Sequence, residues 1–208
     1  TSGYLPKING TYTIGNSVIY DNSGDIGIGF TSTFGKLSIN VNAAAPASSG
    51  NMTNGLTVAN TNGGRAINFG INEAGAYSYI QSAYVNNADT GVKLAFFIGN
   101  QQRMLLDTSG NLGLGVTPSN WNLAGLIPIQ IGATSSLFYF SDTTFLSNNR
   151  YFNSGNKFII TGSATSYDQL LDGSHRWLTS ASGSANADIT FTQAMTLTAA
   201  GRLLINKT

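Results

Sequence analysis

Apolar side chains alternate with small or polar ones in three similar stretches of the chain, residues 18–29, 104–115 and 195–206. In each stretch they stand six and four positions before a central glycine, and two and four positions after it. These side chains are Val18, Tyr20, Ile26 and Ile28, then Met104, Leu106, Leu112 and Leu114, then Met195, Leu197, Leu203 and Ile205. A period of two on both sides of an Asp-x-Ser-Gly or Ala-Ala-Gly break predicts a β-hairpin with these side chains on one inward face.

The central glycines of the three stretches, Gly24, Gly110 and Gly201, lie 86 and 91 residues apart. Recurrence of this kind indicates one β-rich module used repeatedly. The expected modules are residues 1–43 with the first hairpin, 44–118 ending in the second hairpin, and 119–208 ending in a degenerate third one.

Two glycines inside the second strand of the repeat, Gly27 and Gly113, have no side chain to pack. Glycine within a strand marks either a bulge or bend, or a place where another backbone approaches closely. Ile19 and Leu105 make the strands apolar on their other face as well, so a neighbouring chain could supply cover there. Both interpretations stay open at this point.

Further short strands are predicted between the repeats, separated by turn signals such as Asn62-Gly63-Gly64. The expected strands are 55–59, 65–71, 77–85, 92–98, 126–131, 137–140, 157–161, 177–180 and 189–192. Residues 42–50 are typical of a small-residue linker or loose loop, and residues 167–172 of a single helical turn. The pattern contains no long amphipathic helix.

The composition supports an ordered all-β chain with many tight turns. Only 9% of the residues are charged and 25 of 208 are glycine, against about 25% and 7% in average soluble proteins. The 11% of aromatic residues and the many Ile, Leu and Val residues argue against disorder. Because the chain begins with Thr1 rather than methionine, we expect a fragment cut from a longer chain.

Charge and residue usage exclude several kinds of partner. The net charge is +1, and the ten Lys and Arg residues are scattered singly, so we expect no nucleic-acid partner. No apolar run approaches the roughly 18 residues of a membrane span, and we expect a soluble chain without membrane insertion. The absence of cysteine excludes disulfides and thiolate metal sites. We expect no cofactor.

Carboxylates offer little support for catalysis. Glycosidases need two carboxylates about 5 to 10 Å apart, and the local pairs are Asp21 with Asp25 and Asp168 with Asp172. Asp21, like Asp107, belongs to the repeat turn, where an Asx turn is the simpler explanation. We therefore expect no catalytic residue, no metal site and no enzyme activity.

Aromatic residues near Asn and Gln are the candidate contacts for a ligand, because flat rings beside hydrogen-bonding groups suit sugars and other surface receptors. The candidate receptor-binding or glycan-binding residues are Tyr84, Trp121, Tyr151, His175 and Trp177. For the rings, burial in the core is the alternative, and for His175 it is solvent exposure or a structural pair. One histidine also excludes a multi-histidine metal site within a chain. Loops 86–90, 148–156 and 180–186 are further candidate contact surfaces.

Several motifs together resemble the repeat modules of bacteriophage tail fibres and related virion appendages. They are Leu37-Ser38-Ile39-Asn40-Val41, Asp107-Thr108-Ser109-Gly110-Asn111-Leu112-Gly113-Leu114-Gly115, Thr117-Pro118-Ser119-Asn120-Trp121, Ile129-Gln130-Ile131-Gly132, Leu146-Ser147-Asn148-Asn149, the segment 158–162, His175-Arg176-Trp177 and the segment 189–197. The similarity covers most of residues 11–208. The third repeat departs from the pattern, with Leu204 and Asn206 in place of the two later glycines.

The resemblance implies an all-β, elongated and intertwined homotrimeric fibre, with a β-helix-like or β-prism-like shaft and small β-sandwich-like modules. Such modules are often followed by a C-terminal self-cleaving chaperone, which would here be removed or lie outside the fragment. The implied partners are further copies of the chain, other virion tail proteins, and a host surface glycan or outer-surface receptor. The implied location is the virion.

Three hypotheses follow for the function. The first is a structural or receptor-binding segment of a phage tail fibre that mediates attachment to a host cell. The second is a tailspike-like glycan depolymerase. The third is an adhesin or structural filament protein on a bacterial cell surface, because similar modules occur in bacterial surface proteins.

Overall fold

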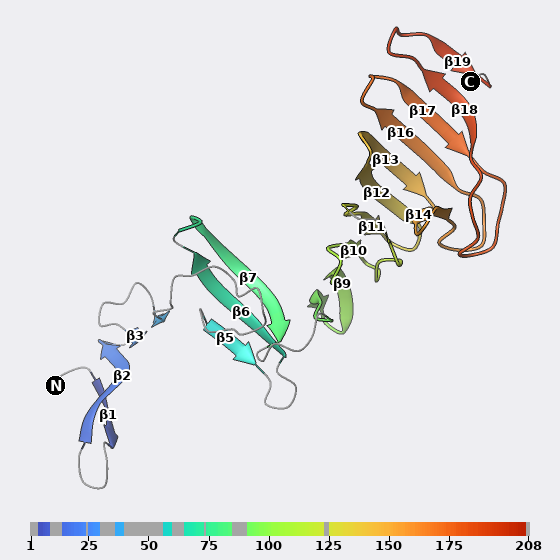
Figure 1. Cartoon of the computed structure of the whole chain (residues 1–208). Helices are drawn as coiled ribbons and strands as arrows, with labels where there is room; N and C mark the ends of the chain where they lie inside the picture. The colour runs from blue at the N-terminus through green and yellow to red at the C-terminus, as the bar shows by residue number, and fades with distance from the viewer. Residues whose placement is uncertain are drawn as a thin grey trace. The chain divides into compact units, whose positions relative to one another are not determined.

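The computed structural model describes residues 4–8, 14–23, 25–29, 36–39, 56–59, 65–72, 74–84, 91–122 and 125–206. Over these residues the chain is all-β and contains no helix, which confirms the predicted class (Figure 1). The chain forms two compact units, Thr1–Val92 and Lys93–Thr208. Their boundary differs from the module boundaries expected at residues 43/44 and 118/119, and the three modules stay a prediction.

The first unit contains two separate sheets. The four-stranded sheet has the order β1 (Tyr4–Ile8), β2 (Ile14–Asn22), β3 (Asp25–Ile28) and β4 (Leu37–Ile39). Its first two pairings are antiparallel and its last is parallel. The three-stranded antiparallel sheet consists of β5 (Leu56–Ala59), β6 (Arg65–Asn72) and β7 (Tyr77–Tyr84).

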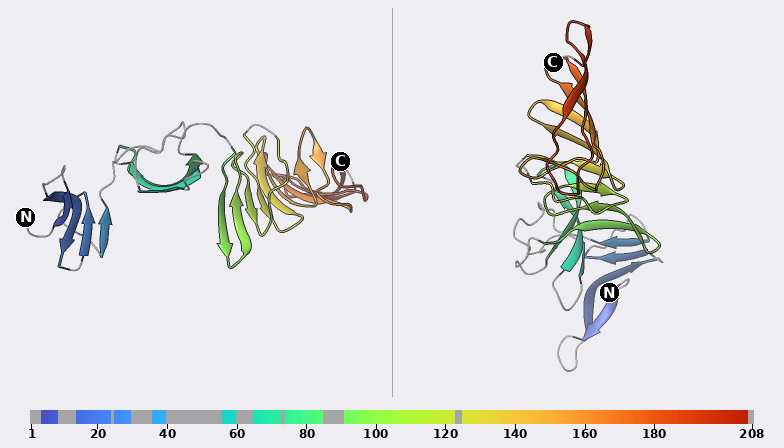
Figure 2. Two further views of the ribbon diagram at one scale, coloured as in Figure 1. Left: turned by 90° about the horizontal axis from the view of Figure 1, so that it is seen from below. Right: turned by 90° about the vertical axis from the view of Figure 1, so that its right-hand side faces the viewer.

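The second unit is built on one ten-stranded sheet, whose strands follow one another from green to red in Figures 1 and 2. The strands are β8 (Leu94–Ile98), β9 (Gln101–Leu106), β10 (Leu112–Leu114), β11 (Ile129–Ile131), β12 (Ser135–Phe140), β13 (Thr143–Asn148), β16 (Thr165–Leu170), β17 (His175–Thr179), β18 (Thr192–Leu197) and β19 (Leu203–Ile205). All neighbours pair antiparallel except β10 and β11, which pair parallel. A separate two-stranded hairpin, β14 (Tyr151–Phe152) with β15 (Asn156–Lys157), interrupts the succession between β13 and β16.

The second and third repeats form the same hairpin, as the alternation predicts. Leu105 lies opposite Gly113, and Thr196 lies opposite Leu204 at the equivalent position. In both hairpins five residues connect the paired strands, and the central glycine has a positive φ, 84° and 77° respectively. Glycine adopts that conformation without strain, which explains its place in the repeat.

The first repeat is also a hairpin, but its register differs by one residue. Tyr20 lies opposite Gly27, and only two residues separate the paired Asn22 and Asp25. A shift of one residue moves a side chain to the other face of the sheet. Val18 and Tyr20 therefore lie on the face opposite Ile26 and Ile28, and the predicted single apolar face is wrong for this copy.

The ten-stranded sheet has one covered and one open face. The covered face includes Ser136, Phe138, Phe145, Ser166 and Asp168, which cross-strand pairing aligns. Segments 116–122, 125–128, 149–164 and 183–191 supply the residues that pack with this face. Two core clusters lie there: Trp121, Leu126, Phe138 and Tyr151, and then Phe158, Ala164 and Ile189.

Buried amides fasten the covering segments to the sheet and to one another. The Gln130 side-chain oxygen accepts the Ser119 N–H at 2.8 Å and the Trp121 Nε1–H at 3.4 Å. Asn149 donates to the carbonyls of Ile160 and Ser163, and its own oxygen accepts the Ile160 N–H. Because unpaired buried polar groups are costly, these bonds fix where the loops lie.

Some predicted elements are wrong. Residues 167–172 were expected as a helical turn, but most of them belong to β16, since Tyr167 and Asp168 pair with strands on both sides. Of segment 157–161 only the first residue is in a strand, and segment 189–192 reaches a strand only at Thr192. β13 was missed, and the expected linker 42–50 lies outside the described residues.

The close approach predicted at the strand glycines comes, at Gly113, from the chain itself. A Cβ atom added to Gly113 would lie 2.1 Å from the Val116 carbonyl oxygen and 2.8 Å from the Pro118 ring. The loop after β10 therefore folds back over the glycine. A neighbouring chain is not needed to explain why this position has no side chain.

Candidate ligand-binding site

Two of the predicted contact residues, Trp121 and Tyr151, are core residues. They are 5% and 6% exposed and pack edge to face, with ring centroids 6.2 Å apart. The Tyr151 hydroxyl donates to the Asn186 side chain at 2.9 Å, which satisfies its polar end. Both rings therefore have the place in the core that was the alternative to ligand contact.

The other three predicted residues have different places in the fold. Tyr84 ends β7 in the first unit, and its side chain is outside the described part of the chain. His175 and Trp177 lie in β17, half-buried, on the open face of the ten-stranded sheet. Trp177 lies opposite Tyr167, with ring centroids 5.0 Å apart, and the Tyr167 hydroxyl is 2.6 Å from His175 Nδ1. His175 is therefore structurally paired.

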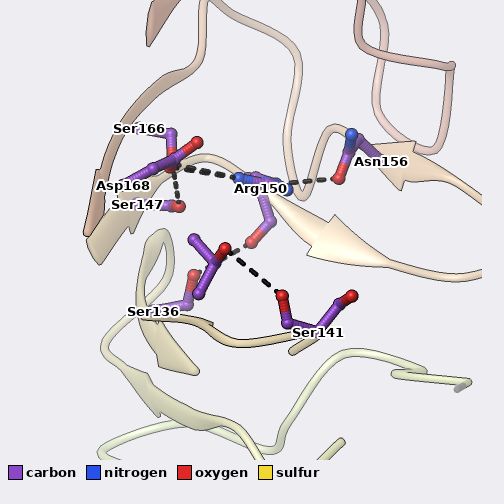
Figure 3. Close-up of polar contacts among 8 residues, drawn as sticks. Ser136, Ser141, Ser147, Arg150, Asn156, Ser166 and Asp168 are labelled. Atoms are coloured by element: carbon purple, nitrogen blue, oxygen red, sulfur yellow. Dashed lines mark hydrogen bonds and ion pairs between the residues drawn. The ribbon is translucent and has the colours of Figure 1, made fainter. Parts of the chain in front are cut away.

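A buried arginine organises the covered face, and the sequence analysis did not single it out (Figure 3). Arg150 is 6% exposed and follows β13 on the segment that crosses the sheet. Its Nε–H donates to the Asn156 side-chain oxygen at 2.8 Å, and its Nη1–H donates to Ser166 Oγ at 3.0 Å. Asp168 supplies the countercharge, with its Oδ1 3.9 Å from Nη1.

The serine hydroxyl groups determine which groups donate and which accept hydrogen bonds around Arg150. Ser166 donates its one hydroxyl hydrogen to Asp168 at 2.5 Å, so it accepts from both Arg150 and Ser147. Ser136 donates to the Arg150 carbonyl oxygen at 3.1 Å. Three serines from adjacent strands thus hold the arginine in place, because β12, β13 and β16 align them in register.

Burial shapes the electrostatics of the Arg150 and Asp168 pair. Desolvation lowers the pKa of Arg150 to about 10, and the charge of Asp168 opposes that shift in part. Desolvation also raises the pKa of Asp168, against the hydrogen bond from Ser166 and the charges of Arg150 and Arg176. Arg150 is therefore a cation at neutral pH. The hydroxyl group of Ser166 connects its guanidinium to the carboxylate of Asp168.

Aromatic rings surround the guanidinium. Its central carbon lies 4.6 Å from the Phe145 ring centroid and 5.1 Å from those of Phe138 and Phe191. Phe138 and Phe145 stack on each other, with centroids 4.7 Å apart. Ring faces attract a nearby cation, so they partly replace the water that burial removes.

A pocket of about 340 Å³ opens beside this arginine, between the β12–β13 hairpin and the covering segment. Its lining combines apolar and polar side chains: Leu126, Phe138, Phe140, Phe145 and Phe152 with Ser141, Thr143, Arg150 and Asn156. Concave sites of this size, mostly aromatic with a few polar groups, are typical of small-ligand binding. We take this pocket as the candidate site.

The sequence analysis identified only some of the residues that line the pocket. Loop 148–156, expected as a contact surface, contributes Arg150, Phe152 and Asn156. The role of Arg150 depends on Asp168, eighteen positions later, and that pairing follows from strand register rather than from local pattern. The alternation in β13, which was not predicted as a strand, could have indicated part of the pocket, because it places Thr143, Phe145 and Ser147 on one face.

Two other acidic residues, Asp107 and Asp172, have structural partners. Asp107 accepts the N–H groups of Ser109 and Asn111 at 2.9 Å each, which confirms the Asx turn predicted in the repeat. Asp172 accepts both the N–H and the hydroxyl of Ser174, and these bonds lower its pKa. Within the described ranges no three His, Asp or Glu side chains form a group suited to a metal ion. The same ranges contain no helix long and apolar enough to cross a membrane.

Comparison with protein-family models and with curated protein sequences returns no match for this chain. Its function is therefore argued from the two surfaces described above, the open face of the ten-stranded sheet and the pocket beside Arg150.

Proposed function

We propose that the chain is a structural and receptor-binding segment of a homotrimeric fibre in a phage tail or similar virion appendage, and that it contributes to attachment to a host cell. The observation that carries this proposal is the uncovered apolar face of the ten-stranded sheet. The resemblance of the repeat motifs to tail-fibre modules supplies the biological setting.

Apolar side chains extend across the whole width of the open face, with uncharged polar ones such as Thr144 and Gln169 between them. Cross-strand register places one or two apolar side chains from nearly every strand on it: Leu94 and Phe96, Met104 and Leu106, Leu112 and Leu114, Ile129 and Ile131, Leu137 and Tyr139, Leu146, Tyr167, Trp177, Met195 and Leu197, and Leu203 and Ile205. Tyr139 is 56% exposed, Leu146 55% and Ile205 62%. Monomeric soluble proteins rarely expose a continuous patch larger than a few hundred Å².

Charge is missing from the same face. None of the strand positions that register places there, from β8 to β19, is Asp, Glu, Lys or Arg. An uncharged apolar surface discriminates poorly by electrostatics, and it favours a partner of equally apolar character. Another copy of the same face meets that requirement.

Three copies arranged about a threefold axis would direct their open faces inward and cover one another. Such closed symmetry also limits the exposure of the edge strands β8 and β19, which would otherwise invite aggregation. The arrangement agrees with the prism-like shaft that the resemblance implies. In the virion, neighbouring tail proteins and a host surface glycan or outer-surface receptor would complete the set of partners.

The proposal is tested by placing a charge at the centre of the open face. Leu137 and Leu146 are cross-strand neighbours there, and we expect Leu146→Lys to convert the trimer into single chains in size-exclusion chromatography with light scattering. Leu171, which is 79% exposed in the β16–β17 turn, provides the matched control. Leu171→Lys should leave the trimer intact. Equal masses for the wild type and both variants, at any oligomeric state, would count against the proposal.

Attachment is tested separately with fluorescently labelled protein and a panel of bacterial cells. We expect the wild type and Leu171→Lys to label the cells of a susceptible strain equally. The single-chain Leu146→Lys variant should label them weakly, because one chain offers one binding site where a trimer offers three. Labelling of no strain by the wild type would contradict the attachment role.

A further inference from the structure

We propose that the pocket beside Arg150 binds a carboxylate-bearing six-membered sugar ring, such as a hexuronic acid residue. As recognition of a host receptor this inference depends on the proposed function. As binding of a small molecule it stands on the geometry of the pocket alone.

The first step concerns the hydrogen-bond donors at the pocket wall. Arg150 uses Nε and Nη1 for Asn156 and Ser166, and Asn156 uses its side-chain oxygen for Arg150. Among the described residues, neither Arg150 Nη2 nor Asn156 Nδ2 has an acceptor, and both side chains line the pocket. Two adjacent donors of this kind match the two oxygens of a carboxylate.

The second step concerns charge. The Arg150 side chain is 7% exposed. Among the described residues no carboxylate accepts a hydrogen bond from it, because Asp168 Oδ1 is 3.9 Å from Nη1 and accepts from Ser166 instead. Arg176 adds a second cation near Asp168. Asp172 is also close enough to Arg176 to feel its charge, so the two arginines and the two aspartates are balanced. Arg150 itself still has no carboxylate in direct contact, and an anionic ligand would supply one.

The third step concerns the shape of the ligand. Phe140 and Phe152 lie side by side at the pocket, with ring centroids 5.9 Å apart, and Phe138 and Phe145 stack behind them. Their ring surfaces suit the apolar C–H face of a pyranose. Thr143 and Ser141 add hydroxyl groups at the wall, which favours a hydroxylated ring over a purely aromatic acid. The volume of about 340 Å³ suits one or two such rings.

The pocket is tested by saturation-transfer NMR of the wild-type protein with three probes, glucuronate, glucose and benzoate. We expect glucuronate to bind about tenfold more tightly than glucose, since only glucuronate offers an acceptor to the free donors. We also expect it to bind more tightly than benzoate. Equal binding of glucuronate and glucose would refute the carboxylate site, and tighter binding of benzoate would refute the sugar.

Variants locate the binding. Phe140→Ala removes a ring at the pocket without touching the Arg150 network, and it should weaken glucuronate binding about tenfold. Phe97→Ala is the matched control, because Phe97 is an exposed ring in β8 that does not line the pocket, and it should leave glucuronate binding unchanged. Arg150→Lys keeps the charge but loses the paired donors, and a folded variant should no longer prefer glucuronate to glucose. Unchanged binding in Phe140→Ala would overturn the assignment even if Arg150→Lys fails to fold.

The result also separates the two proposals. A trimer that does not bind glucuronate would refute the pocket and leave the fibre intact. A single chain that binds glucuronate would refute the trimer and leave the pocket intact.

Discussion

At the scale of single residues, Gly113 shows that a glycine in a repeat can be required by a contact within its own chain rather than with a neighbouring chain. The Leu105–Gly113 pairing recurs in the third repeat as Thr196 opposite Leu204, so the hairpin itself tolerates a side chain at this position. The requirement for glycine comes from the returning loop, whose Val116 carbonyl oxygen occupies the space of a Cβ atom.

Gly113→Ala should therefore destabilise the second unit more than a change at a neighbouring glycine. We expect a loss of about 1 to 3 kcal/mol in the free energy of unfolding, because the loop backbone must move. Gly115→Ala is the control: space is open around it, but its φ of 69° disfavours a side chain, at a cost of about 1 kcal/mol. Urea unfolding measures both, and an equal or smaller loss for Gly113→Ala would contradict the account.

Asp168 and Asp172 should respond to pH with opposite signs. Burial raises the pKa of Asp168 above its unfolded value of 3.8, so its contribution to stability is greatest below that pH and is lost as pH rises through the raised pKa. Hydrogen bonds from Ser174 lower the pKa of Asp172, so its contribution is present above 3.8 and is lost as pH falls through the lowered pKa.

The measurement is urea unfolding of the wild type, Asp168→Asn and Asp172→Asn in steps from about pH 3 to pH 6. Between those limits the stability of the wild type relative to Asp168→Asn should decrease as pH rises, and its stability relative to Asp172→Asn should increase. Parallel curves for all three proteins would show that the Asp168 carboxyl is not buried as described.

At the scale of elements, strand alternation predicted hairpins well and strand neighbours poorly. The three hairpins depend on contacts within about a dozen residues, which the period of two and the turn residues encode. The parallel pairings of β3 with β4 and β10 with β11 join strands across longer connections. Nothing in the local pattern distinguishes those partners, so the sequence analysis predicted several of the strands but not the ten-stranded sheet.

The candidate site shows the same division. Sequence reasoning selected aromatic residues and the loop that carries Arg150, because composition reports such features directly. It could not distinguish a core ring such as Trp121 from a pocket ring such as Phe140. Which of the two a ring becomes depends on how the covering segments fold over the sheet. The misassigned segment 167–172 also hid Asp168, because only a strand places it on the same face of the sheet as Ser166, two residues earlier in β16.

The third repeat provides a test of the turn geometry at element scale. Asn206 occupies the position of Gly115 and retains a positive φ of 49°, and its N–H donates to the Ala194 carbonyl as that of Gly115 does to Arg103. Asn tolerates this conformation better than other side chains. Asn206→Gly should thus preserve or slightly raise stability, whereas Asn206→Ala should cost about 1 kcal/mol. A stabilising Asn206→Ala in thermal unfolding would show that the residue is not held in this conformation.

At the scale of the whole molecule, the central question is what covers the open face of the ten-stranded sheet. Since that face lacks charged residues, burying it between chains should depend on apolar surface rather than on ion pairs. Association should then be unaffected by sodium chloride and strengthened by sulfate, which favours burial of apolar surface. Dissociation of the assembly by moderate sodium chloride would indicate a polar interface elsewhere.

The most direct test is sedimentation equilibrium of the wild-type protein at about micromolar concentration. We expect a single species with three times the 21.8 kDa mass of the chain. A mass equal to one chain, in a folded protein that leaves Leu146 and Ile205 exposed to solvent, would contradict the proposed trimer.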